Sequence, residues 1–176
     1  MATTIQKRMT SRRDEGFVVF LIGMRMNRWW KPWSWLPVVM AMPRMIRELL
    51  AKPELGFLGA ESYFGRTTMM LSYWKSKEDL LAFASSRSGT HLPAWKAFYS
   101  AIGTNGDVGI WHETYVVAPG TYENVYVNMP PFGLGAVAGL VEATGPNARA
   151  ARRLAGGAAP AEVPVTSLPP ELEAVR

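Results

Sequence analysis

Residues 17–25 read FVVFLIGMR and residues 108–117 read VGIWHETYVV, and these two stretches decide the fold. Both are short and rich in β-branched and aromatic residues, which predicts strands. The first is apolar on both faces, as is typical of a central strand. The second alternates with a period of two, so His112 shares a mostly apolar face with Val108 and Ile110.

The chain between these strands predicts three helices and a hairpin. The expected elements are a helix from Pro43 to about Ala51, which a turn at 38–42 kinked at Pro43 can precede, strands at 57–64 and 67–74, a helix capped by Ser76, and a helix over 91–102 that Thr90 caps. The order is βαββαβ, with the second helical unit broken in two. It predicts an α+β, ferredoxin-like fold, with a four-stranded antiparallel sheet and helices on one face. The other face needs a cover, and a second copy of the chain supplies it, so we expect a homodimer.

Composition predicts one folded domain followed by a tail. Hydrophobic residues make up 48% and charged residues 19% of the chain, which is typical of a globular protein. We place the domain at 14–142 and expect 143–176, rich in Ala and Pro, to be largely mobile apart from a short helix at 148–154. The first residues lack the apolar core of a signal peptide, and the longest apolar stretch is too short to span a bilayer. We therefore expect a cytoplasmic protein.

The scarcity of two residue types in the sequence excludes several kinds of catalytic and metal site. The chain has no cysteine, which excludes disulfides, thiolate catalysis, iron–sulfur clusters and Cys-based zinc sites. It has two histidines, His91 and His112, so we expect no metal site built from several histidines.

The two histidines are the candidates for chemistry. Helical spacing aligns His91 with Trp95 and Phe98 on a face that looks back at the sheet, so both imidazoles can border one cavity between sheet and helices. The alternative is that each is a core histidine satisfied by a backbone carbonyl or a carboxylate. A neutral imidazole in an apolar pocket can accept a proton, donate one or ligate haem iron.

Other candidates lie at the ends of strands. Asn27 and Arg25 end the first strand, where they can reach a substrate oxygen. Trp74 ends the third strand and is a second candidate to steady a developing negative charge, although aromatic packing is the ordinary explanation. Phe83 is expected beside it in the pocket.

The segment WWKPWSW, residues 29–35, is the oddest local feature. A pocket lid or a dimer contact rich in indoles is favoured over a membrane anchor or a base-stacking surface. Residues 1–52 hold ten Lys and Arg against three Asp and Glu, which accounts for the net charge of +5. The simplest interpretation of this excess of positive charge is a solvent-exposed surface. We therefore expect neither nucleic acid nor a membrane surface as a partner.

Three stretches together resemble a known family. They are VVFLIGMRMNRWW, the run LGFLGAESYFGRTTMMLSYWKSKEDLLAFA with HLPAWKAF after it, and GDVGIWHETYVV with YENVYVNMPPFGL after it. They look like an uncharacterised monooxygenase-like family, typified by a polyketide monooxygenase of the fungal fumagillin pathway. The resemblance covers about 17–134 and implies the dimeric α+β barrel fold.

The resemblance also implies a function. The wider superfamily includes antibiotic-biosynthesis monooxygenases, which oxidise electron-rich polyketides with O₂ and need no metal or flavin. It also includes haem-binding enzymes, and the stretch YWKSKEDLLAF is similar to a haem-degrading group. Carried over, Phe83 stands where that group has Trp, and His91 falls two residues before the position of the haem ligand.

Our leading hypothesis is a small monooxygenase-like enzyme that acts on a hydrophobic secondary metabolite such as a polyketide. Its base is His91 or His112, its partners are the substrate, O₂ and a second copy of itself, and it requires no cofactor. The alternatives are an enzyme that binds haem b through His91 and a barrel that binds an apolar ligand without catalysis.

Overall fold

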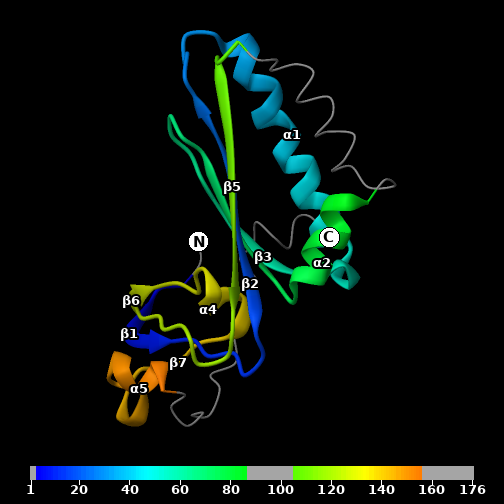
Figure 1. Cartoon of the computed structure of the whole chain (residues 1–176). Helices are drawn as coiled ribbons and strands as arrows, with labels where there is room; N and C mark the ends of the chain where they lie inside the picture. The colour runs from blue at the N-terminus through cyan, green and yellow to red at the C-terminus, as the bar shows by residue number, and fades with distance from the viewer. Residues whose placement is uncertain (1–2, 87–104, 156–176) are drawn as a thin grey trace. The chain divides into compact units, whose positions relative to one another are not determined.

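The computed structural model describes residues 3–86 and 105–155, without the side chains of 41, 42 and 44. Within it the chain divides into two compact units (Figure 1). One unit combines residues 1–17 with 116–176, and the other is 18–115. The predicted domain at 14–142 therefore draws on both units, and the first unit also holds a strand before residue 14 and a helix after residue 142.

The second unit is built on the predicted four-stranded sheet. Its strands are β2 (Phe17–Met26), β3 (Phe57–Tyr63), β4 (Met69–Trp74) and β5 (Val108–Val117), in the spatial order β3-β4-β2-β5. β2 and β3 both pair antiparallel with β4, and the Asn27 N–H donates to the Asp107 carbonyl where β2 ends and β5 begins. This is the ferredoxin-like order, which confirms the predicted fold class.

Helices α1 (Pro32–Ala51) and α2 (Lys77–Ser85) lie on the same side of this sheet (Figure 1). They bury a core in which Val18 and Trp74 of the sheet meet Leu49, Leu80 and Phe83 of the helices. The short helix η1 (Pro53–Leu55) joins α1 to β3. The predicted helix over 91–102 lies outside the described residues.

Helix α1 begins at Pro32, and the predicted start at Pro43 is wrong. Pro32 occupies the first turn, where a missing N–H costs no hydrogen bond, whereas Pro37 and Pro43 stand inside the helix. An interior proline costs about 3 kcal/mol. Trp35, Val38 and Val39 pack against Met24 and Val108 in a second apolar cluster, and this burial offsets the cost.

Helix α2 is capped as predicted. Ser76 precedes the helix in an extended conformation, and its hydroxyl oxygen accepts from the Asp79 N–H at 3.1 Å. Gly56 lies close by with φ of +76°, and a Cβ at this position would fall 2.4 Å from the Asp79 carboxylate. Both the backbone conformation and the close approach therefore require glycine.

The first unit has its own small sheet. Strand β1 (Ile5–Thr10) pairs antiparallel with β6 (Tyr126–Met129) on one side and with β7 (Val141–Glu142) on the other. Helix α4 (Leu134–Ala138), the short helix η2 (Gly145–Asn147) and helix α5 (Ala150–Leu154) complete it. Strand β1 was not predicted because its residues, IQKRMT, are mostly polar, and α5 matches the short helix predicted at 148–154.

Candidate functional site

His112 lies on the face of the sheet that α1 and α2 cover. Its imidazole contacts the Phe20 ring, with centroids 6.0 Å apart and the planes tilted by 44°. Phe20 in turn packs against the core that the sheet forms with the helices. The side chain of His112 is exposed, and within the described ranges neither of its ring nitrogens forms a hydrogen bond. A neutral imidazole can accept a proton or donate one, which makes His112 a candidate for proton transfer.

An aromatic wall belongs to the core against which Phe20 packs. The Trp74 ring packs against Phe57 at 5.4 Å and against Phe83 at 5.5 Å between centroids. Trp74 is 1% exposed, and its indole N–H donates to the Ser72 hydroxyl at 3.1 Å. That hydroxyl donates to the Phe20 carbonyl at 3.0 Å, so one hydrogen-bonded chain holds the wall to the strand that carries Phe20.

Asn27 and Arg25 lie at the far end of β2 from Phe20. The Asn27 amide donates to the Gly106 carbonyl at 3.1 Å, and the Arg25 guanidinium donates to the Thr67 hydroxyl at 2.9 Å. Asn27 adjoins Asp107, the residue before β5, and His112 is five residues further along the strand, a distance of about 17 Å. The structure therefore does not bring these two residues to the imidazole.

The remaining predicted site residues, His91, Trp95 and Phe98, lie outside the described residues. The expectation that two imidazoles share one cavity stays a prediction. The haem ligand predicted at His91 also stays a prediction, and no step of the chemistry below runs through haem.

Asp107 is a functional candidate that the sequence analysis missed. Its carboxylate is buried just before β5, and it accepts from the Lys31 ammonium at 3.0 Å, the Arg28 guanidinium at 2.6 Å and the Ser34 hydroxyl at 3.3 Å. The hydrogen bond from Lys31, followed by that from Arg28, holds the pKa of Asp107 below its usual value, against the opposing effect of desolvation.

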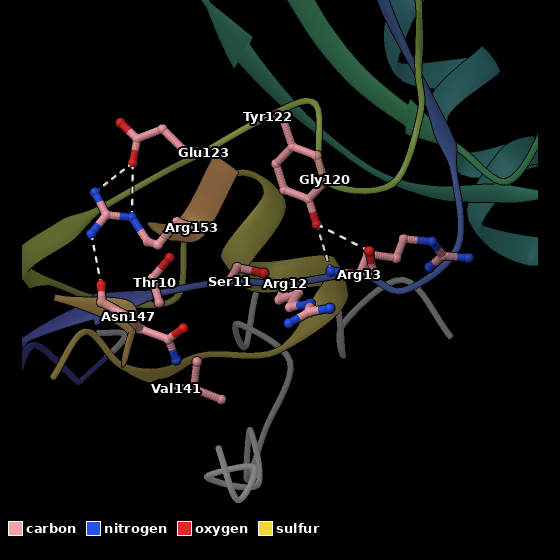
Figure 2. Close-up of a pocket in the computed structure, with 10 residues that line it drawn as sticks. All are labelled: Thr10, Ser11, Arg12, Arg13, Gly120, Tyr122, Glu123, Val141, Asn147 and Arg153. Atoms are coloured by element: carbon pink, nitrogen blue, oxygen red, sulfur yellow. Dashed lines mark hydrogen bonds and ion pairs between the residues drawn. The ribbon is translucent and has the colours of Figure 1, made fainter. Parts of the chain in front are cut away.

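A cavity in the first unit has a different character (Figure 2). Arg153 fills one side, where its guanidinium donates to the Glu123 carboxylate at 2.6 Å and to the Asn147 carbonyl at 2.7 Å. On the other side the Tyr122 hydroxyl accepts from the backbone N–H of Arg13 (Figure 2). The cavity volume is about 30 Å³, room for roughly one or two water molecules and not for an apolar metabolite.

Burial also marks two tyrosines of this unit. Desolvation raises the pKa of Tyr122 and of Tyr126, although the backbone hydrogen bonds that each phenol forms act in the opposite direction. Both phenols therefore stay protonated at neutral pH and act as hydrogen-bonding groups, and neither is suited to be a base there.

The chain matches one family model. The model, described as Monooxygenase af470-like, covers residues 17–134, about two thirds of the chain. The chain belongs to this family. The Monooxygenase af470 of Aspergillus fumigatus is 36% identical over 95 residues, which are 49% of this chain and 32% of that protein. The chain thus spans about a third of the length of the curated relative that it matches.

Solved structures share the fold. An aldoxime dehydratase crystallised with butyraldoxime is 16% identical, with a TM-score of 0.60 over 78% of this chain and 43% of that one. A second aldoxime dehydratase structure gives 15% identity and the same TM-score over 78% of this chain and 44% of that one. At these identities the likeness concerns the fold alone.

The family match distinguishes the two candidate places. Residues 17–134 contain His112, Phe20 and the whole aromatic wall. The cavity of the first unit takes Arg13, Asn147 and Arg153 from outside that range. The face around His112 is therefore the candidate active site of this family member.

The described residues contain neither a candidate metal site nor a membrane-spanning helix. No three or more acidic, histidine or cysteine side chains gather there as a metal site. No helix in the described part of the chain has both the length and the apolar character that crossing a bilayer requires.

Proposed function

We propose that this chain is a small monooxygenase-like enzyme that oxidises a hydrophobic secondary metabolite, such as a polyketide, with His112 as its base. One observation carries the proposal: in a member of a monooxygenase-like family, an imidazole without a hydrogen-bond partner in the described chain stands on the helix-covered face of the sheet beside Phe20. The Phe20 ring and the apolar core behind it support the choice of an apolar substrate.

The chemistry requires an acidic proton whose loss places negative charge on a carbon that still carries a hydrogen. A methylene group flanked by carbonyls (C–H acid) and a phenol with an unsubstituted para carbon (O–H acid) both meet this requirement. His112 takes the proton, and the carbanion gives one electron to O₂. The radical pair combines to form a C–O bond, and the imidazolium returns its proton to the peroxide. Loss of water then leaves a ketone, so one atom of O₂ enters the product and the other leaves as water. O₂ is the sole oxidant, and the step needs no external reductant.

Oxygen uptake tests this assignment. With a panel of polycyclic phenols and β-diketones, we expect the full chain to consume O₂ and His112→Ala to lose about 100-fold or more of the rate. The control is Glu78→Gln, because Glu78 is an exposed residue in the first turn of α2. Turnover that survives His112→Ala would show that this imidazole is not the base.

The same preparation separates the two alternatives. An absorption spectrum with a Soret band that vanishes in His91→Ala would support the haem enzyme. Tight binding of the panel compounds without any oxygen uptake would support the barrel that only binds ligands. A colourless protein that consumes O₂ would support the oxidation that needs no cofactor.

We also infer that the enzyme works as a homodimer through the sheet face that lies opposite α1 and α2. Leu21 and Leu71 are neighbours on this face, and Trp111 stands over Gly23. A Cβ at Gly23 would fall 2.0 Å from the Thr68 carbonyl oxygen and 2.8 Å from the Trp111 indole nitrogen. These closely packed apolar residues support a face that joins two copies.

A further inference from the structure

Five large apolar side chains at the start of α1 stand in solvent. We call Trp29, Trp30, Trp33, Leu36 and Met40 the tryptophan patch. The indoles are 63%, 57% and 70% exposed, and Leu36 and Met40 are 46% and 67% exposed. The expected roles of the segment are a pocket lid or a dimer contact. This exposure does not favour the lid, because a lid buries its indoles.

Three residues of the patch share one face of α1, and the other two come just before the helix. Trp33, Leu36 and Met40 follow one another at spacings of three and four residues along α1, so they share one face of the helix. Trp29 and Trp30 precede the helix start. Their rings meet edge to face, with centroids 6.4 Å apart and an angle of 84°.

The turn that carries the first two indoles is held in place. The backbone N–H of Arg28 donates to the Asp107 carbonyl, and the Arg28 and Lys31 side chains donate to the Asp107 carboxylate. The Trp35 indole N–H also donates to the Trp29 carbonyl at 3.0 Å. The turn is therefore preorganised with its indoles pointing outward. Exposing this apolar area to water is unfavourable, so a binding partner that covers it would stabilise the arrangement.

Cations surround the same end of the unit. Arg25, Arg28, Lys31 and Arg66 come together there, and the carboxylate that lies among them is Asp107. Arg66 joins the hairpin tip to β2, since its guanidinium donates to the Met26 and Asn27 carbonyls. We call these four residues the basic collar. Beside it, Phe64 of the hairpin tip is 80% exposed.

We propose that the tryptophan patch and the basic collar dock this protein on the surface of an anionic phospholipid bilayer. Indoles prefer the boundary between headgroups and acyl chains, and Leu36 and Met40 add aliphatic surface that can enter the hydrocarbon. The collar faces lipid phosphates, which attract lysine and arginine near the membrane surface. The inference goes beyond the proposed function and does not depend on it.

The geometry of the patch favours a lipid surface over nucleic acid or a second copy of this chain. Nucleic-acid bases stack on aromatic faces, whereas the Trp29 and Trp30 rings are almost perpendicular and Leu36 and Met40 have no π face. A second copy that docked by this same end would bring two basic collars together, and like charges across an interface oppose association.

Flotation with phosphatidylcholine vesicles, with and without phosphatidylglycerol, tests the proposal on the full chain. We expect the protein to float with the anionic vesicles, and to bind about tenfold or more weakly at high salt or in neutral vesicles. The double variant Trp30→Ala and Trp33→Ala should lose about tenfold or more of the binding. Leu81→Ala is the matched control, because Leu81 is 62% exposed on α2, away from the patch, and its loss should leave binding unchanged.

Three outcomes would overturn the proposal. The first is a failure to bind anionic vesicles at low salt, while circular dichroism shows a folded protein. The second is binding to single-stranded nucleic acid that the double variant abolishes, without vesicle binding, which would assign the patch to base stacking. The third is a concentration-dependent dimer that the double variant abolishes, which would assign the patch to a second copy. Oxygen uptake in detergent-free buffer reports on the proposed function separately.

Discussion

At the scale of single residues, Ser72 connects the aromatic wall to the strand that faces His112. Its hydroxyl is fully buried between the Trp74 indole N–H and the Phe20 carbonyl. Ser72→Ala leaves the indole N–H without an acceptor in the core, which costs about 1–3 kcal/mol. We expect the urea midpoint of unfolding to fall accordingly. Ser85→Ala is the control, because Ser85 is exposed and its hydroxyl donates to the Leu81 carbonyl of its own helix turn. Equal midpoints for the two variants would contradict the prediction.

Asp107 gives the stability of the protein a dependence on acid. Because Lys31 and Arg28 lower its folded pKa below the usual value of 3.8, the ionised carboxylate stabilises the folded state. That contribution is present above the usual pKa and is lost as the pH falls through the lower, folded pKa. We expect the urea midpoint of the wild type to fall on acidification below about pH 4 by more than that of Asp107→Asn. Parallel curves for the two proteins would show that Asp107 does not contribute.

At the scale of elements, the cap of α2 carries its own prediction. Ser76→Ala removes the oxygen that accepts from the Asp79 N–H and should cost about 1 kcal/mol of unfolding free energy. Ser76→Thr keeps an acceptor in the same place and should cost a few tenths of a kcal/mol at most. Chemical denaturation measures both variants. A loss as large in Ser76→Thr as in Ser76→Ala would mean that shape, and not the cap, matters at this position.

Local pattern explains which elements could be predicted. β-Branched and aromatic residues predicted the strands β2 and β5. The alternation along β5 predicted that His112 shares a face with Val108 and Ile110, and in the structure its ring contacts Phe20 on the helix-covered face. The start of α1 was not predicted, because a proline inside a helix is locally unfavourable. In this helix the packing of Trp35, Val38 and Val39 against the sheet outweighs that local cost.

Partners distant in the sequence explain what could not be predicted. Asp107 draws its role from Arg28 and Lys31, some eighty residues earlier, and no spacing rule joins them. Strand β1 exists because β6 and β7 pair with its polar backbone from the other end of the chain. Both features arise from long-range pairing that a local pattern does not encode.

At the scale of the whole molecule, the family match and the division into units do not coincide. The match runs from 17 to 134, whereas the second unit is 18–115. The face around His112, the aromatic wall and the tryptophan patch all belong to the second unit. The first unit has a small cavity instead, and Arg153 in its lining is hydrogen-bonded to Glu123 and Asn147. Substitutions within 18–115 should therefore affect the proposed oxidation and membrane docking more than those in the other unit.

Self-association provides the last test. If two copies join through the face opposite α1 and α2, native mass spectrometry should show a dimer, and Leu21→Glu should convert it to a monomer. The reason is that a carboxylate buried at an apolar interface without a partner costs several kcal/mol. Leu81→Glu adds the same charge at an exposed position of α2 and should leave the dimer intact. Circular dichroism must show that both variants are folded. A wild type that stays monomeric at every concentration, or a Leu21→Glu variant that stays dimeric, would show that this face does not join two copies.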